Sequence, residues 1–114
     1  MNTIRISKDF APRTGARFKR LGPHSGEEFQ NLLLKRLASA TANDPLYVYI
    51  DGKNGYFSSF LEEAFGGLVR TNKITPADLE KKLIIEADCD ANQPYVKQAK
   101  QYIQEAIARL NEAS

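Results

Sequence analysis

The sequence contains few of the residues from which metal and disulfide sites are built: one cysteine, one histidine and no tryptophan in 114 residues. A single cysteine, Cys89, excludes an internal disulfide framework and suits a reducing compartment. Metal centres need several converging ligands at regular spacing, and no such spacing is present. The sequence therefore indicates no metal and no cofactor, and we expect a cytoplasmic protein.

Long apolar runs are also missing, since the longest extends over only a few residues. No run is long enough to span a bilayer, and the first residues lack the basic-then-apolar pattern of a secretory signal. The remaining composition, 42% apolar and 26% charged, is typical of globular proteins. We expect one domain over residues 1–114 and no membrane partner.

The net charge of only +2 conceals an asymmetry along the chain. Residues 1–24 carry six basic side chains and one acidic side chain, whereas residues 25–114 carry ten and thirteen. The basic segment is either a solvated loop or, with Phe10 and Phe18 interleaved, a surface for nucleic acid or an acidic protein face. The low overall charge favours the solvated loop. The basic residues of the alternative patch are Arg5, Arg13, Arg17, Lys19 and Arg20.

The N-terminal segment predicts a β-hairpin. Residues 3–6 alternate polar and apolar side chains, as a short strand does. Proline and glycine within residues 11–15 break this strand, and residues 16–20 return as its antiparallel partner.

A helix and a strand are predicted next. Ser25 followed by Glu28 is a helix-start signature, and apolar residues recur at helical spacing over residues 27–41. Residues 46–51 form a nearly uninterrupted apolar and aromatic run. Such a run is typical of a strand that is buried on both faces, as in the centre of a parallel sheet.

The last third of the chain predicts two helices and a strand. Thr75 followed by Pro76 predicts the start of a short helix to about residue 82. Residues 83–87 form the last strand, and a long amphipathic helix begins at Pro94. The resulting order, β-β-α-β-α-(α)-β-α, predicts a small mixed four-stranded sheet covered by helices.

Ser58 and Ser59 mark the most informative position of the chain, where the strand of residues 46–51 leads through a turn into a helix. Ser59 and Glu62 have the spacing of a reciprocal capping box. Free N–H groups and the helix dipole also favour an anion there. Two glycines at 66–67 cost about 1 kcal/mol each relative to alanine in a helix interior. We expect close packing at these glycines to offset the cost.

Catalytic motifs are not evident around these serines. A hydrolase built from Ser58 or Ser59, His24 and Asp51 would lack the Gly-x-Ser-x-Gly elbow. Residues 52–55 are too short for a phosphate-binding loop. The sequence therefore predicts a protein that is not an enzyme, with small-molecule binding or hydrolysis beside Asp51 and Ser58 as a minor alternative.

Three stretches together resemble the bacterial family of STAS-like domains of unknown function: residues 6–10 (ISKDF), 22–29 (GPHSGEEF) and 58–68 (SSFLEEAFGGL). The resemblance implies a fold similar to the STAS domains of anti-sigma factor antagonists. In those regulators a partner of the histidine-kinase-like ATPase class phosphorylates a serine at a helix start. The resemblance places Ser59 at that position with Ser58 beside it, while Phe57 and Phe60 replace an aspartate and a glycine.

We therefore expect a non-catalytic regulatory module, similar to anti-sigma factor antagonists, that docks a protein partner through the strand–helix edge of residues 51–68. The resemblance implies an ATP-binding, kinase-like or anti-sigma-like partner and phosphorylation of Ser59 or Ser58. The residues expected to contact the partner are Asp51, Tyr56, Phe57, Phe60, Glu62 and Glu63. A nucleic-acid-binding protein that uses the basic segment is the alternative.

Overall fold

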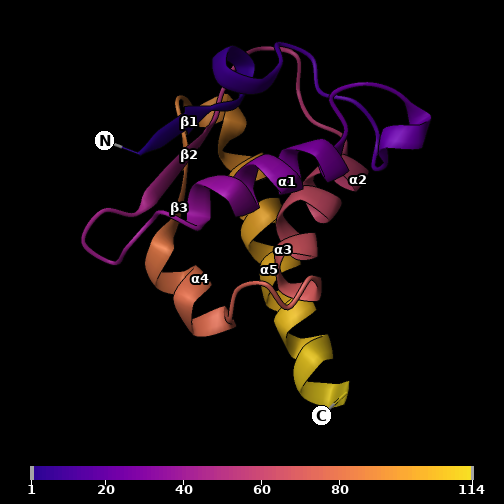
Figure 1. Ribbon diagram of the computed structural model, residues 1–114. Helices are drawn as coiled ribbons and strands as arrows, with labels where there is room; N and C mark the ends of the chain where they lie inside the picture. Colours follow the sequence, from indigo (N-terminus) through magenta and orange to yellow (C-terminus); the bar gives the residue numbers. More distant parts are fainter. Residues whose placement is uncertain (1, 114) are drawn as a thin grey trace.

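The computed structural model describes residues 2–113 and contains a parallel sheet with helices packed against it (Figure 1). The strands are β1 (Thr3–Arg5), β2 (Leu46–Ile50) and β3 (Leu83–Ala87), in the spatial order β1-β2-β3. The α-helices are α1 (Gly26–Leu37), α2 (Ser58–Leu61), α3 (Gly67–Arg70), α4 (Pro76–Lys82) and α5 (Gln93–Ala113). Short helical segments are η1 (Ile6–Phe10) and η3 (Glu62–Gly66), both π-helical, and η2 (Lys19–Leu21) and η4 (Asp90–Asn92), both 3-10.

The predicted four-stranded mixed sheet is wrong in its number of strands and in the hairpin. Within residues 2–113 the sheet has three strands, and both pairings are parallel. Residues 16–20 do not pair with β1, because the carbonyls of Ala16 and Arg17 accept hydrogen bonds from the N–H groups of Gly26 and Glu27. These carbonyls satisfy two of the free N–H groups at the start of α1.

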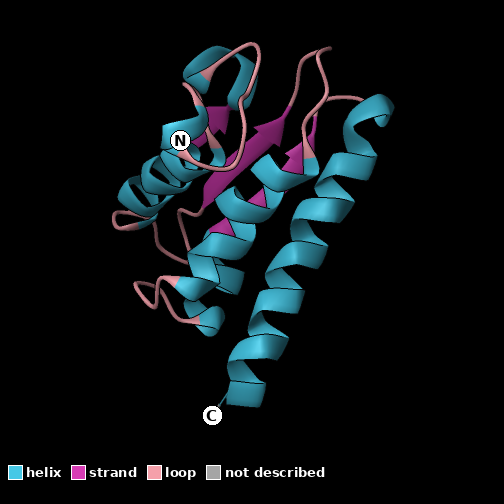
Figure 2. Cartoon of the chain, turned by 90° about the vertical axis from the view of Figure 1, so that its right-hand side faces the viewer, coloured by secondary structure: helices cyan, strands magenta, loops and turns pink. Residues whose placement is uncertain are grey.

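The two faces of the sheet differ in burial. One face is buried against the helices through Ile4, Leu46, Val48, Ile50, Leu83 and Ile85. The opposite face consists of Thr3, Arg5, Tyr47, Tyr49, Ile84 and Glu86, all partly or fully exposed. Helices α1, α3 and α5 lie on the same side of the sheet in both views (Figures 1 and 2). The prediction that β2 is buried on both faces is therefore wrong, and the face that carries its two tyrosines is open.

Three helices begin where local signals predict. The Ser25 hydroxyl accepts a hydrogen bond from the N–H of Glu28 at 3.1 Å and caps α1. Thr75 caps α4 in the same way, with Pro76 in the first turn. Helix α5 begins at Gln93, one residue before Pro94. These predictions are confirmed, although α1 ends at Leu37 rather than near residue 41.

The segments α2, η3 and α3 form one continuous helix over residues 58–70 with a π-helical section in its middle. Its two glycines lie close to neighbouring helices, as predicted. A Cβ at Gly67 would lie 2.4 Å from Nε2 of Gln30 in α1, and a Cβ at Gly66 would lie 3.3 Å from the carbonyl oxygen of Tyr102 in α5. Helix α5 packs against this helix and against β3. No helix within the described residues is long and apolar enough to cross a membrane.

Candidate functional site

The loop between β2 and the helix of residues 58–70 is attached to the N-terminal segment through Asp51. The Ser7 N–H donates to Oδ1 of Asp51 and the Ser7 hydroxyl donates to Oδ2, each at 2.8 Å. Asp51 is 6% exposed, so these bonds satisfy a carboxylate that has left bulk water. The loop then turns at Gly52 and Gly55, whose φ values of 88° and 71° favour glycine.

Two further side chains hold this loop. The Tyr56 hydroxyl donates to the carbonyl oxygen of Asp51 at 2.6 Å. The side-chain amide of Asn92 donates to the carbonyl oxygen of Gly52 at 3.0 Å and to Oδ1 of Asp88 at 2.9 Å. Burial and the nearby charge of Asp51 raise the pKa of Tyr56, so its hydroxyl remains a donor. Side chains from three separate parts of the chain thus determine the conformation of the loop.

Beside this loop lies a hollow with a volume of about 350 Å³. It is lined by Arg13, Thr14, Asn54, Gly55, Tyr56, Phe57 and Tyr95. The rings of Tyr56 and Tyr95 meet edge to face with centroids 5.4 Å apart. Phe57 is 67% exposed at the hollow, which is unusual for a large apolar side chain.

The expected capping box at the serines is wrong. The helix already begins at Ser58, and Phe57 occupies the N-cap position without a side-chain hydrogen bond. Glu62 cannot reach back to the start of the helix, because its carboxylate is bound to Arg17 and Arg70. The N–H groups of the first turn have no partner within the helix and receive no cap from the Phe57 side chain. Ser58 beside them is exposed and Ser59 is half-buried.

A cluster of four charged side chains lies one turn further along the helix. Arg17 and Arg70 each form ion pairs with Glu62 and with Glu63. Burial alone would raise the pKa of Glu62, but the hydrogen bonds from Arg70 and Arg17 outweigh burial and lower it. The same contacts with Glu62 raise the pKa of Arg70. Arg17 therefore ties the basic N-terminal segment to the helix.

The six residues expected to contact a partner fall into three groups. Asp51 and Phe60 are buried, and the Phe60 ring packs at 5.8 Å from Phe29 and 6.0 Å from Tyr56. Glu62 and Glu63 are half-buried within the charged cluster. Tyr56 is half-buried, and Phe57 is the one of the six that is exposed.

The sequence of this region belongs to a known family. A sequence model described as a STAS-like domain of unknown function matches residues 25–90, which is more than half of the chain. The chain belongs to this family. The matched range runs from the cap of α1 to the start of η4 and includes residues 58–68, whereas residues 6–10 lie before it. No curated protein and no solved structure matches the chain.

The five basic residues of the alternative nucleic-acid patch are distributed over several elements. Arg5 lies on the open face of the sheet, with its guanidinium 4.7 Å from the centre of the Tyr49 ring. Arg13 lines the hollow, and Arg17 is part of the charged cluster. Lys19 and Arg20 lie in the exposed η2 segment, and the guanidinium of Arg20 stacks on Phe18 at 5.2 Å.

A serine hydrolase arrangement is not assembled in the described part of the chain. Within residues 2–113, no hydrogen bond joins His24 to Asp51, Ser58 or Ser59. Both carboxylate oxygens of Asp51 instead accept hydrogen bonds from Ser7. His24 is exposed, and its ring lies nearly perpendicular to the Phe10 ring with centroids 5.9 Å apart.

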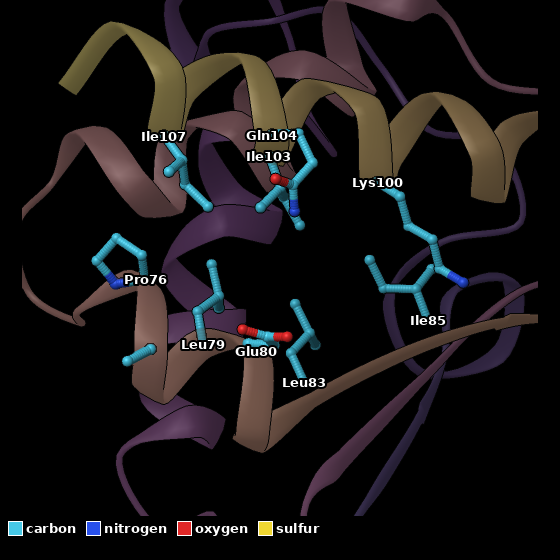
Figure 3. Close-up of a pocket in the computed structure, with 10 residues that line it drawn as sticks. Pro76, Leu79, Glu80, Leu83, Ile85, Lys100, Ile103, Gln104 and Ile107 are labelled. Atoms are coloured by element: carbon cyan, nitrogen blue, oxygen red, sulfur yellow. The ribbon is translucent and has the colours of Figure 1, made fainter. Parts of the chain in front are cut away.

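A larger hollow of about 550 Å³ lies between α4, β3 and α5, away from the serines (Figure 3). Its apolar lining includes Leu79, Leu83 and Ile103, while Lys100 and Glu80 add one charge of each sign. None of the predicted site residues contributes to it. The candidate site is therefore the smaller hollow, whose lining includes the predicted residues Arg13, Tyr56 and Phe57.

Proposed function

We propose that this STAS-like domain is a non-catalytic regulatory module that docks a protein partner through the edge of residues 51–68. The observation that carries the proposal is the exposed ring of Phe57 on an anchored loop. An aromatic side chain on a backbone that is fixed before binding contributes strongly to association, because the loop loses little conformational entropy.

The hollow beside Phe57 defines the chemistry of the surface. Tyr56 and Tyr95 present aromatic walls, and the exposed Arg13 adds a cation. A partner that inserts an apolar side chain and places a carboxylate near Arg13 would complement it. The partner proposed here is a histidine-kinase-like ATPase, the class that binds the anti-sigma factor antagonists whose STAS domains this chain resembles.

The serines supply a regulatory input in this proposal. A phosphate on Ser58 or Ser59 would lie at a helix start with free N–H groups, which favours negative charge. The nearby charges of Glu62 and Glu63 are already paired with Arg17 and Arg70, which lessens their repulsion of a phosphate. Phosphorylation would then change the charge beside Phe57 without unfolding the helix.

A binding assay against purified histidine-kinase-like ATPases from the same genome tests the docking proposal. Phe57→Ala should weaken binding about tenfold or more, as truncation of an interface anchor does. Leu21→Ala is the matched control, because Leu21 is also largely exposed, at 57%, but lies outside the hollow. Failure of every ATPase to bind, or equal loss in both variants, would contradict docking through Phe57.

Intact mass measurement after incubation with ATP and the same ATPases tests the phosphorylation proposal separately. One added phosphate on the wild type, absent from Ser59→Ala or from Ser58→Ala, would identify the modified residue. A wild-type mass that remains unchanged with every ATPase would remove phosphorylation from the proposal and leave docking intact.

Nucleic-acid binding receives less support from the arrangement of charges. Arg17 is neutralised by two glutamates, and Arg5 lies on the sheet rather than in the N-terminal loop. Titration with DNA and RNA at low salt checks this. Salt-sensitive binding that is lost on reversal of Lys19 and Arg20 would favour nucleic acid over a protein partner.

A further inference from the structure

The open face of the sheet carries two rows of side chains that cross all three strands. One row is Thr3, Tyr47 and Ile84, and the other is Arg5, Tyr49 and Glu86, as the strand register requires. The contact between the Arg5 guanidinium and the Tyr49 ring confirms that both side chains lie on this face. The tyrosines and Ile84 are half-buried, whereas Arg5 and Glu86 are exposed.

An uncovered face is unusual for a parallel sheet. All-parallel sheets occur almost only where both faces are covered, and their strands then read as continuous apolar runs. Strand β2 has such a run, Leu-Tyr-Val-Tyr-Ile. In a single copy of the chain, however, the helices cover only the face that carries Leu46, Val48 and Ile50. The sequence of β2 thus fits a strand with a second layer over its tyrosines.

The charges on the open face are arranged with opposite signs at opposite edges. Arg5 lies on edge strand β1, Glu86 on edge strand β3, and Tyr49 lies between them on β2. Two strand spacings separate the edges, or about 10 Å. Within residues 2–113 neither Arg5 nor Glu86 forms an ion pair.

We infer that a second copy of this chain covers the open face, with a two-fold axis that runs parallel to β2 between the two sheets. That axis exchanges the two edges of the sheet, so Arg5 of each copy faces Glu86 of the other and Tyr49 faces Tyr49. Such an interface is self-complementary and closes as a dimer. This inference is independent of the docking proposal, which concerns residues 51–68.

The alternative in-plane axis, perpendicular to the strands, is disfavoured by the same charges. It would place β1 against β1 and β3 against β3, which brings Arg5 near Arg5 and Glu86 near Glu86. Like charges face to face cost free energy, so the charge pattern selects one packing over the other.

The size of the face sets the expected affinity. Three short strands give a face about 10 Å by 17 Å, which is small for a protein interface. The dimer should therefore be weak and sensitive to salt. The helices lie on the opposite side of the sheet, so the dimer leaves them uncovered (Figure 2).

Sedimentation equilibrium of the full chain, from micromolar to millimolar concentration, tests the dimer. Arg5→Glu and Glu86→Arg should each weaken the dimer by about tenfold, because symmetry makes every reversal act at two contacts. The double variant Arg5→Glu/Glu86→Arg restores opposite charges and should return to the wild-type dissociation constant. Lys97→Glu, on the exposed side of α5, is the matched control and should leave it unchanged.

Cross-linking tests the position of the axis. In a Cys89→Ser background, Tyr49→Cys chains should link to each other through a short bismaleimide. Arg5→Cys chains should link to Glu86→Cys chains, and neither should link to itself. A monomer at every concentration, a dimer unaffected by both charge reversals, or self-linking of Arg5→Cys would overturn the inference.

Discussion

Ser7 and Asp51 are joined by two hydrogen bonds, from the Ser7 N–H and from the Ser7 hydroxyl, to the two oxygens of one carboxylate. The pair connects the segment after β1 to the residue after β2, at neighbouring strand ends. Asp51 is buried, so in the proposed docking it would support the loop that carries Phe57 rather than contact the partner.

Replacing Asp51 should destabilise the fold. Asp51→Ala leaves the Ser7 N–H without its acceptor, and an unsatisfied donor out of water costs about 1–3 kcal/mol in the free energy of unfolding. Urea denaturation measures this loss. Asp44→Ala, at an exposed position before the same strand, is the control and should change stability by less than about 0.5 kcal/mol. Similar losses in both variants would contradict the importance of the Ser7 contact.

Because of Tyr56, the stability of the fold should depend on pH in the alkaline range. Its pKa in the folded state is raised above the usual 10.0 by burial and by the charge of Asp51. A raised folded pKa stabilises the protein fully below the pKa of the unfolded chain, and this stabilisation is lost as the pH rises through the folded value. The advantage of wild type over Tyr56→Phe, about 0.5–1.5 kcal/mol at neutral pH from one hydrogen bond, should therefore shrink above pH 10. Urea denaturation of both proteins at several pH values measures it, and a constant difference would argue against this environment.

Because of Glu62, the stability of the fold should depend on pH in the acidic range. Its pKa is lowered below the usual 4.5 because Arg70 and Arg17 outweigh the effect of burial. A lowered folded pKa contributes stability that is present above the unfolded value and is lost as the pH falls through the folded value. Wild type should therefore lose more stability than Glu62→Gln as the pH drops below 4.5.

Thermal unfolding midpoints at several pH values measure the Glu62 effect. The control is Glu80→Gln, which removes an exposed carboxylate that forms no ion pair within the described residues. The unfolding midpoint of this control should fall with decreasing pH as steeply as that of the wild type. Parallel profiles for wild type and Glu62→Gln would show that the charged cluster contributes little.

Gly26 should not tolerate a side chain. A Cβ at this position would lie 2.7 Å from the carbonyl oxygen of Phe60, where the start of α1 meets the helix of residues 58–70. The backbone cannot give way as a flexible side chain would, so Gly26→Ala should cost about 1–3 kcal/mol. Asn31→Ala, on the exposed side of α1, should be nearly neutral in the same denaturation experiment. Unchanged stability of Gly26→Ala would mean that the two helices separate easily.

The parts of the fold that local chemistry specifies were predictable from the sequence. Ser25 with Glu28, and Thr75 with Pro76, predict helix starts, because each cap oxygen and the N–H group that donates to it lie within one turn. The apolar spacing after Pro94 likewise predicts α5. The close packing at Gly66 and Gly67 followed from the cost of glycine in a helix.

The predictions were wrong where a residue distant in the sequence binds a group that could have formed its hydrogen bond locally. The carbonyls of Ala16 and Arg17 could have paired with β1, but the start of α1 supplies donors that bind them. Glu62 could have completed the capping box with Ser59, but Arg17 binds its carboxylate from 45 residues away. Asn92 was missed altogether, because its contact with Gly52 joins positions 40 residues apart and leaves no pattern in the sequence.

The sequence by itself determined the family, the helix starts and the apolar patterns, because these depend on residues within a few positions of one another. Only the tertiary structure decided that Phe57 is exposed while Phe60 is buried, that Asp51 supports the loop, and that the Tyr47 and Tyr49 face of β2 is open. Burial and the choice of hydrogen-bond partner are properties of the packed chain. A strand pattern states which side chains share a face, and packing alone decides what covers it.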